Sequence, residues 1–238
     1  MHIFVPNLNQ EKLSITGDDY FHITRSLRKI VGDKLILVSL SDDFFAEAEI
    51  VEMSKKTLVA KVLKKVTKQP KNKPAITLIQ AIIKRAGMEL VLQKATELGV
   101  DWIIPLKTKY IVPKAEEVNL KRWETIMREA AVQSRRFYLP ELGNPLDLKN
   151  LSMLKKQYPQ IFCLAETQGS LNLKEHLTHL NKDISSLAVI IGPEGGFAPE
   201  ELEGLKKEGI PLVSFGQTIL RAETAAISML SVLRWFFL

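Results

Sequence analysis

The sequence predicts an α/β fold made of a small β-rich domain followed by a larger parallel-sheet domain. After residue 75, short apolar runs alternate with amphipathic segments of helical length, the pattern of a parallel sheet covered by helices on both faces. Residues 1 to about 66 hold closely spaced strand-like segments with little helix, which favours a small β-barrel. The polar, proline-bearing run 67–74 has linker composition, so we predict domains at 1–72 and 73–238.

The first domain is predicted to contain one helix among its strands. Asp18 and Asp19 are suited to cap a helix that runs from Tyr20 to Ile30. Alternating or apolar patterns predict strands at Lys34–Leu40, Phe44–Met53 and Thr57–Val66.

The second domain reads as alternating strands and helices. The predicted strands are 76–82, 102–106, 161–164, 188–191 and 212–215. The predicted helices are 88–98, closed by Gly99, then about 120–137, a helix opened by Pro199, and 223–236.

Three of these strands end in loops whose composition is typical of ligand binding. The first continues into 164–167, the second into the glycine-rich run 191–196, and the third into 215–226. Ligands of doubly wound sheets lie beyond the carboxyl ends of the strands, and glycines allow the backbone to approach a ligand closely. If the three strands are neighbours, their loops form one pocket.

The absence of several sequence motifs argues against several classes of site. No G-x-G-x-x-G fingerprint, P-loop lysine or serine nucleophile elbow is present, which disfavours a nicotinamide cofactor, ATP and serine catalysis. The single cysteine, Cys163, lies in an apolar run and is expected to be buried and inert, and the four histidines have no zinc-ligand spacing. No metal is predicted.

The charge is moderately basic and unevenly distributed. The net charge is +6, and residues 1–73 carry 13 Lys and Arg against 9 Asp and Glu. A phosphate-bearing partner fits this balance. The residues proposed to contact such phosphates are Arg25, Arg28, Lys29, Lys84, Arg85, Arg135 and Arg136. For each of them, an ordinary solvated surface charge is the alternative interpretation.

The expected location is the cytoplasm. No apolar run approaches the roughly 20 residues that span a bilayer, and the N-terminal stretch lacks the pattern of a secretory signal. No membrane association is predicted.

Several motifs together resemble the RsmE-like uracil-N3 methyltransferases of 16S ribosomal RNA. They cover nearly the whole chain in the order of that family, with one departure at Val132, where an acidic residue is expected. The motifs are His22 with 25–28, Gly32-Asp33, 93–99, Arg122-Trp123, Glu129-Ala130, Gln133-Ser134, Arg136, G-P-E-G-G-F at 192–197 and G-x-x-I-L-R-A-E-T-A at 216–225.

The resemblance implies a fold, a cofactor and an assembly that the residue pattern cannot give. Such enzymes belong to the SPOUT class, whose C-terminal segment forms a deep trefoil knot that binds S-adenosylmethionine, and they usually work as homodimers. The N-terminal domain would be a PUA-like barrel that helps to hold RNA. The substrate would be 16S rRNA, within an assembled or nearly assembled small ribosomal subunit.

The resemblance also implies the site residues. The cofactor would be bound by Leu164, Ala165, Glu166, Ile191, Gly192, Pro193, Glu194, Gly195, Gly196, Phe215, Gly216, Ile219, Leu220, Arg221, Thr224 and Ala225. Arg221 is the candidate for stabilising charge on the uracil carbonyls, unless it pairs with Glu223 or Glu194 to close the loop. These two glutamates are the other catalytic candidates, and the proton acceptor stays open.

Two alternatives differ in function. One keeps the SPOUT fold but methylates a ribose 2′-hydroxyl or a transfer RNA base. The other is a non-catalytic RNA-binding protein with a vestigial pocket, against which the intact glycines and Arg221 argue.

Overall fold

The chain divides into two compact units. The computed structural model describes residues 2–110, 118–167 and 169–237. One unit comprises Met1–Pro70 with Ala131–Leu139, and the other comprises Lys71–Ala130 with Pro140–Leu238. The segment 131–139, which the linker composition assigned to the second domain, therefore clusters with the first.

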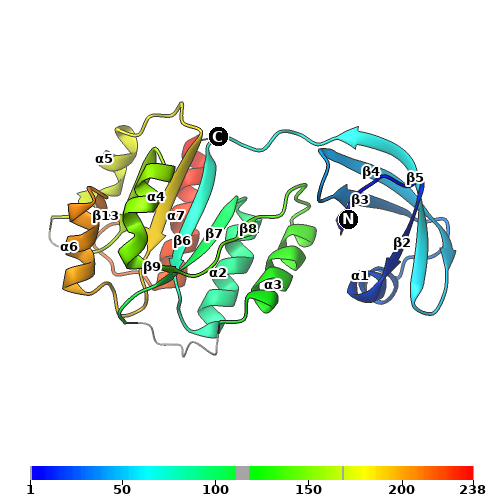
Figure 1. Ribbon diagram of the computed structural model, residues 1–238, viewed down its shortest axis with the longest axis horizontal. Coiled ribbons are helices and arrows are strands. Elements are labelled where there is room, and N and C mark those ends of the chain that lie inside the picture. Colours follow the sequence, from blue (N-terminus) through cyan, green and yellow to red (C-terminus); the bar gives the residue numbers. More distant parts are fainter. Residues whose placement is uncertain (1, 111–117, 168, 238) are drawn as a thin grey trace. The chain divides into compact units, whose positions relative to one another are not determined.

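The first unit is a curved five-stranded sheet with one short helix (Figure 1). Its elements are β1 (His2–Val5), β2 (Lys12–Thr16), α1 (Gly17–Phe21), the π-helical turn η1 (His22–Ser26), β3 (Lys34–Ser39), β4 (Phe44–Met53) and β5 (Thr57–Thr67). The strand order is β1-β3-β4-β5-β2, with β1 and β3 parallel and the other pairs antiparallel. Two register shifts between β4 and β5 bend the sheet, and the buried core of this unit is mostly aliphatic.

The segment 131–139 packs on aromatic and apolar residues of this same unit. The ring of Phe137 lies 4.5 Å from the ring of His2 and 4.7 Å from that of Phe45. Nδ1–H of His2 donates to the carbonyl oxygen of Arg136 at 2.9 Å. His2 is buried, so it anchors the loop that carries Arg135 and Arg136.

We expect this anchor to make stability depend on pH. Burial lowers the pKa of His2 below its ordinary value of 6.5, so on acidification the unfolded chain takes up a proton before the folded chain does. The free energy of unfolding should therefore fall as the pH drops through about 6.5. Burial lowers the pKa of His176 as well, so a His2→Gln variant should lose only part of the pH dependence. Urea titrations of both proteins at several pH values measure this, and identical pH slopes would contradict it.

The predicted helix Tyr20–Ile30 is wrong in its second half. Regular α-helix ends at Phe21 and the π-helical turn at Ser26, because Arg28 adopts a left-handed backbone with φ 53°. The amide of Lys29 reaches back to the carbonyl of Ile23. Arg25, Arg28 and Lys29 consequently do not share a helix face.

The second unit is a parallel sheet between two layers of helices. Its strands are β6 (Ala75–Ala81), β7 (Trp102–Lys107), β8 (Glu141–Leu142), β9 (Leu146–Asp147), β10 (Gln160–Leu164), β11 (Leu171–Asn172), β12 (Ser186–Ile191) and β13 (Leu212–Ser214). Its helices are α2 (Arg85–Glu97), α3 (Leu120–Gln133, whose last turn belongs to the first unit), the 3-10 turn η3 (Leu148–Asn150), α4 (Leu151–Gln157), α5 (Leu173–Thr178), α6 (Pro199–Lys207) and α7 (Ala222–Phe237).

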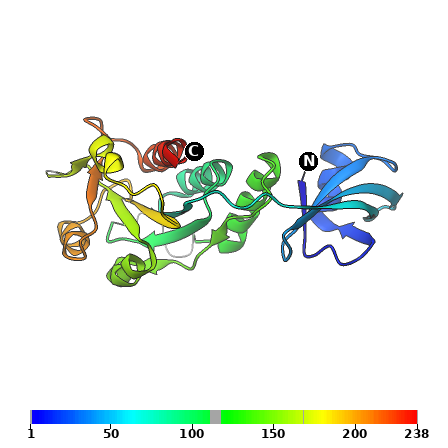
Figure 2. The same cartoon turned by 90° about the horizontal axis from the view of Figure 1, so that it is seen from above.

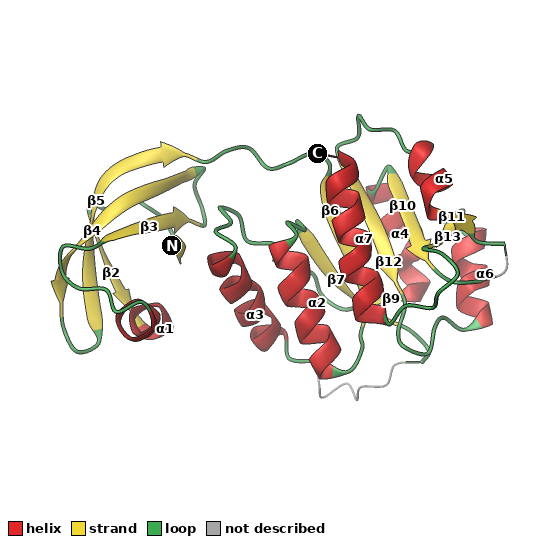
Figure 3. Ribbon diagram, turned by 180° about the vertical axis from the view of Figure 1, so that it is seen from behind, coloured by secondary structure: helices red, strands yellow, loops and turns green. Residues whose placement is uncertain are grey.

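The sheet has the order β11-β13-β10-β12-β6-β7-β8, with β9 beside β7, and all its pairs are parallel. Figures 2 and 3 show α2 and α7 on one face and α4 on the other. The apolar clusters agree, because α2, α3, α5 and α7 pack in one and α4 and α6 in the second. The predicted parallel sheet with helices on both faces is thus confirmed.

Two further details concern the sequence predictions. Helix α3 ends at Gln133 rather than near 137, because Arg135 takes a left-handed backbone with φ 56°.

Cys163 is fully buried, and burial raises the pKa of its thiol, which keeps it protonated and inert. No helix within the described ranges is long and apolar enough to cross a bilayer.

Candidate active site

The three loops predicted to bind a ligand, at 164–167, 191–196 and 215–226, follow strands that are neighbours in the sheet. β10 lies between β12 and β13, and Leu164 pairs with both Ile191 and Val213, so the three strands end at one level. Their loops form a pocket of about 380 Å³. It is lined by Leu164, Ala165, Glu166, Thr167, Ile191, Gly192, Pro193, Glu194, Gly195, Gly196, Phe197, Leu202, Ile219, Leu220, Ala222 and Ala225.

Most residues predicted to bind the cofactor line this pocket, and a few do not. Arg221 and Thr224 adjoin lining residues in the chain, and Phe215 and Gly216 precede the lining residue Ile219, but none of these four is itself a lining residue. Sequence reasoning missed Thr167, Phe197, Leu202 and Ala222. Phe197 was the easiest to find, since it closes the G-P-E-G-G-F run.

Two glycines of the second loop are needed for different reasons. A Cβ on Gly192 would stand 2.8 Å from the ring of Phe197, well inside van der Waals contact. Gly196 has φ +73° with open space around it, so its requirement is backbone conformation. The first glycine lets Phe197 pack against the loop, and the second lets the chain turn towards α6.

Two carboxylates tie the loops together. Glu166, in the first loop, accepts the backbone N–H of Phe215 at 2.9 Å and the hydroxyl proton of Ser214, both at the end of β13. Glu194, in the second loop, accepts the backbone N–H of Lys84 at 3.2 Å, just before α2. These bonds give Glu166 and Glu194 a role in holding the pocket walls.

Arg221 and Glu223 stand at the start of α7. The carbonyl of Arg221 accepts the amide of Ala225 at 2.8 Å, while its side chain is exposed and makes no ion pair with a carboxylate in the described part of the chain. The alternative pairing of Arg221 with Glu223 or Glu194 is therefore not seen there. Oε2 of Glu223 lies 3.7 Å from the Cβ position of Gly87 in α2.

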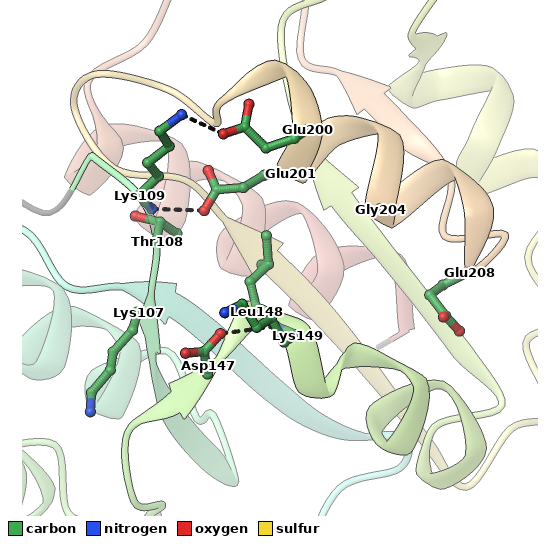
Figure 4. A pocket seen from close by; sticks show the side chains of 10 residues that line it. All are labelled: Lys107, Thr108, Lys109, Asp147, Leu148, Lys149, Glu200, Glu201, Gly204 and Glu208. Carbon is green, nitrogen blue, oxygen red and sulfur yellow. Dashed lines mark hydrogen bonds and ion pairs between the residues drawn. The ribbon is translucent and has the colours of Figure 1, made fainter.

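A second pocket of about 470 Å³ adjoins the N-terminal turn of α6 (Figure 4). Glu201 bridges two segments there: one carboxylate oxygen accepts the amide of Lys109 at 2.7 Å and the other accepts that of Ala198 at 2.8 Å. The Lys109 ammonium pairs with Glu200 at the surface. Glu201 thus fastens the end of the glycine loop to the segment after β7.

We expect Glu201→Ala to weaken cofactor binding several-fold and to lower stability by about 1–2 kcal/mol, because two backbone donors lose their acceptor. Glu200→Ala is the matched control, since it removes a solvent-exposed ion pair, which contributes little to stability, and leaves both Glu201 hydrogen bonds in place. Thermal unfolding with and without S-adenosylmethionine measures both effects. Equal behaviour of the two variants would contradict the bridging role.

The basic residues predicted to contact RNA occupy different environments. In the second unit, Arg85 forms an ion pair with Glu89 at 3.0 Å, and Arg122 approaches the same carboxylate at 3.4 Å. Hydrogen bonds from Arg122 and Arg85 hold the pKa of Glu89 below its usual range. Arg85 is thus partly neutralised, whereas Lys84 meets Glu194 only through its backbone. The described ranges contain no group of His, Cys, Asp or Glu able to hold a metal ion.

Comparison with known proteins agrees with this geometry. Residues 70–234 match the model of an RNA methyltransferase domain, and residues 15–63 match an RNA methyltransferase PUA domain. Ribosomal RNA small subunit methyltransferase E of Mesomycoplasma hyopneumoniae is 31% identical over 97% of this chain and 98% of its own. The Rickettsia conorii protein of the same name is 34% identical, over 94% of this chain and 89% of its own.

A solved structure is similar over almost the entire chain. A Legionella pneumophila protein described as a methyltransferase, in complex with the bound cofactor SAM, superposes with a TM-score of 0.87 at 30% identity, covering 98% of this chain and 96% of that one. The α/β fold with a PUA-like N-terminal unit is thus shown by both sequence and structure. The chain belongs to the family of ribosomal RNA small subunit methyltransferase E, RNA methyltransferases that carry a PUA domain.

Proposed function

We propose that this protein transfers the methyl group of S-adenosylmethionine to N3 of one uridine in the 16S rRNA of the small ribosomal subunit. The observation that carries the proposal is the pocket formed by the loops after β10, β12 and β13, in a chain whose family is named for small-subunit rRNA methylation. The target atom, uracil N3, follows from the resemblance to RsmE-like enzymes.

The pocket fits the cofactor in size and chemistry. Its volume of about 380 Å³ lies in the range of about 300–1,000 Å³ found for small-molecule sites. Apolar side chains such as Leu164, Ile191 and Leu220 offer flat walls for an adenine, and the backbone of 192–196 offers amides and carbonyls. Ile219 lies on the rim with 85% of its surface exposed, which leaves it free to cover a ligand. The related Legionella protein is described with SAM bound.

The protein must remove the proton on uracil N3 and stabilise the negative charge that develops on the base. S-adenosylmethionine supplies an electrophilic methyl group on a sulfonium. Uracil N3 must lose its proton, and negative charge develops on the two flanking carbonyl oxygens. We assign the stabilisation of that charge to the guanidinium of Arg221, which pairs with no carboxylate in the described part of the chain. Glu194 is engaged with the Lys84 amide, so we assign it a positioning role and retain Glu223 as the carboxylate available for catalysis.

The proposal extends to the assembly and the location of the enzyme. We propose a homodimer, supported by Trp235 on α7, which is 77% exposed and would lose that exposure in an interface. The substrate would be an assembled or nearly assembled small subunit in the cytoplasm. Light scattering on the wild type and a Trp235→Glu variant tests the dimer: both proteins running as monomers would remove this part of the proposal.

Two measurements separate the proposed function from the alternatives. Isothermal titration with S-adenosylmethionine should show one site per chain, and absence of heat at high micromolar cofactor would leave only an RNA-binding protein. Mass mapping of ribosomal RNA from a strain lacking the gene should show the loss of one methyl group on one uridine of 16S rRNA. Unchanged ribosomal RNA would remove the proposed target.

A further inference from the structure

The segment 21–31 of the first unit combines rare backbone conformations that α-helix patterns do not explain. The π-helical turn His22–Ser26 directly follows α1 and ends the helical segment, and π-helical turns are frequent at functional sites. Arg28 has φ 53°, which costs a non-glycine residue about 1 kcal/mol or more. Two hydrogen bonds from the residues that follow Arg28 accompany this conformation: the Lys29 amide donates to the Ile23 carbonyl, and the Ile30 amide donates to the Asp33 carboxylate.

The same segment presents exposed cationic and apolar side chains to solvent. The guanidinium of Arg25 lies over the ring of Phe21, 4.6 Å from its centroid, and Phe21 is 38% exposed. Neither Arg25 nor Arg28 forms an ion pair with a described carboxylate. Close by in sequence, Ile30 is 66% exposed and Val31 is also exposed. We call Phe21, Arg25, Arg28, Ile30 and Val31 the reader surface.

A ligand for this surface needs both flat apolar faces and negative charge. Unpaired nucleotides provide them together, since a base stacks on an arginine plane or an aromatic ring while its phosphate meets a cation. A duplex hides its base faces and offers only phosphates. The basic balance of residues 1–73 is complementary to RNA. Phosphate contact alone does not explain why the Arg25 guanidinium lies over the ring of a partly exposed Phe21.

We propose that the reader surface binds single-stranded RNA by stacking an unpaired base on the Phe21–Arg25 pair, with Arg28 holding the adjacent phosphate. The inference rests on the proposed function in taking RNA as the ligand. It goes further by assigning the PUA-like unit a single-stranded element of the substrate, read through base faces rather than through phosphates alone.

The test is fluorescence anisotropy of the full-length protein with a labelled unstructured RNA oligonucleotide and with the same oligonucleotide in a duplex. Arg25→Lys keeps the charge but loses the plane, and Phe21→Leu loses the ring. Each should weaken single-strand binding about 5- to 30-fold, which corresponds to the 1–2 kcal/mol expected for one stacked base. Duplex binding and the salt slope should be unchanged. Phe44→Leu is the matched control, because Phe44 is 44% exposed in the same unit but lies outside the segment.

Failure of this inference can be distinguished from failure of the proposed function. Wild-type single-strand affinity in both Arg25→Lys and Phe21→Leu would overturn the inference, even in an enzyme that methylates ribosomal RNA normally. Equal losses on single strand and duplex would also overturn it, by reducing the surface to a phosphate contact. A loss confined to single strands supports it, whether or not S-adenosylmethionine binds to the second unit. If these variants bind RNA normally but release a protein partner, the surface is a protein-docking site and the inference fails.

Discussion

Replacing Arg221 with alanine is expected to reduce methyl transfer about 10²- to 10³-fold while leaving S-adenosylmethionine binding within a few-fold of the wild type. The expected loss is that of one preorganised donor facing a developing negative charge. In the structure the Arg221 side chain is exposed and no described carboxylate neutralises it. Single-turnover rates with small ribosomal subunits as substrate, alongside isothermal titration with the cofactor, measure the two properties separately.

Two controls define this result. Arg221→Lys keeps the charge but not the planar fork, so it should recover part of the rate. Lys207→Ala removes an exposed cation at the far end of α6 and should leave the rate unchanged. Full turnover by Arg221→Ala would show that the residue has no part in catalysis.

Gly192→Ala is expected to weaken S-adenosylmethionine binding about tenfold or more. The new methyl group would stand 2.8 Å from the Phe197 ring, and relief of such overpacking costs about 1–3 kcal/mol, of which 1.4 kcal/mol is a factor of ten in affinity. Phe197 lines the pocket together with Gly192, so its displacement changes the shape of the binding site. Isothermal titration measures the affinity directly.

Gly204→Ala is the matched control for this prediction. Gly204 lies in α6, where an added Cβ meets nothing within 4 Å, and alanine in a helix gains up to about 1 kcal/mol over glycine. That variant should bind the cofactor normally and unfold at the same or a higher temperature. If Gly192→Ala binds as tightly as Gly204→Ala, the Phe197 contact does not shape the site.

The regular elements of the fold were predictable where hydrophobic patterning is strong. The runs at 161–164 and 188–191 do form buried strands, the run at 212–215 forms one that ends at Ser214, and Pro199 does open a helix. The two-residue strands β8, β9 and β11 were not predictable, since pairs such as Leu171–Asn172 carry no periodicity. Both overlong helices end near an arginine in a left-handed conformation, at 28 and 135, and that conformation has no sequence signal comparable to glycine or proline.

The loops that form the site were predictable from the sequence, but their assembly into one pocket was not. Glycine content marked 191–196, but nothing in the sequence states that β10 lies between β12 and β13. The side-chain bridges of Glu166, Glu194 and Glu201 to backbone amides join loops distant in sequence, so no local pattern reports them. For the same reason, the linker composition that set the predicted domain boundary could not reveal that Phe137 packs on His2. The trefoil knot implied by the resemblance stays a prediction.

The most direct test is to locate the methyl group after reaction of the purified protein with labelled S-adenosylmethionine and small ribosomal subunits from cells that lack the enzyme. Nuclease digestion followed by mass spectrometry distinguishes 3-methyluridine from ribose-methylated uridine and from other methylated bases. The expected product is one 3-methyluridine per 16S rRNA. Label on a ribose or another base, or no transfer despite a filled cofactor pocket, would contradict the account.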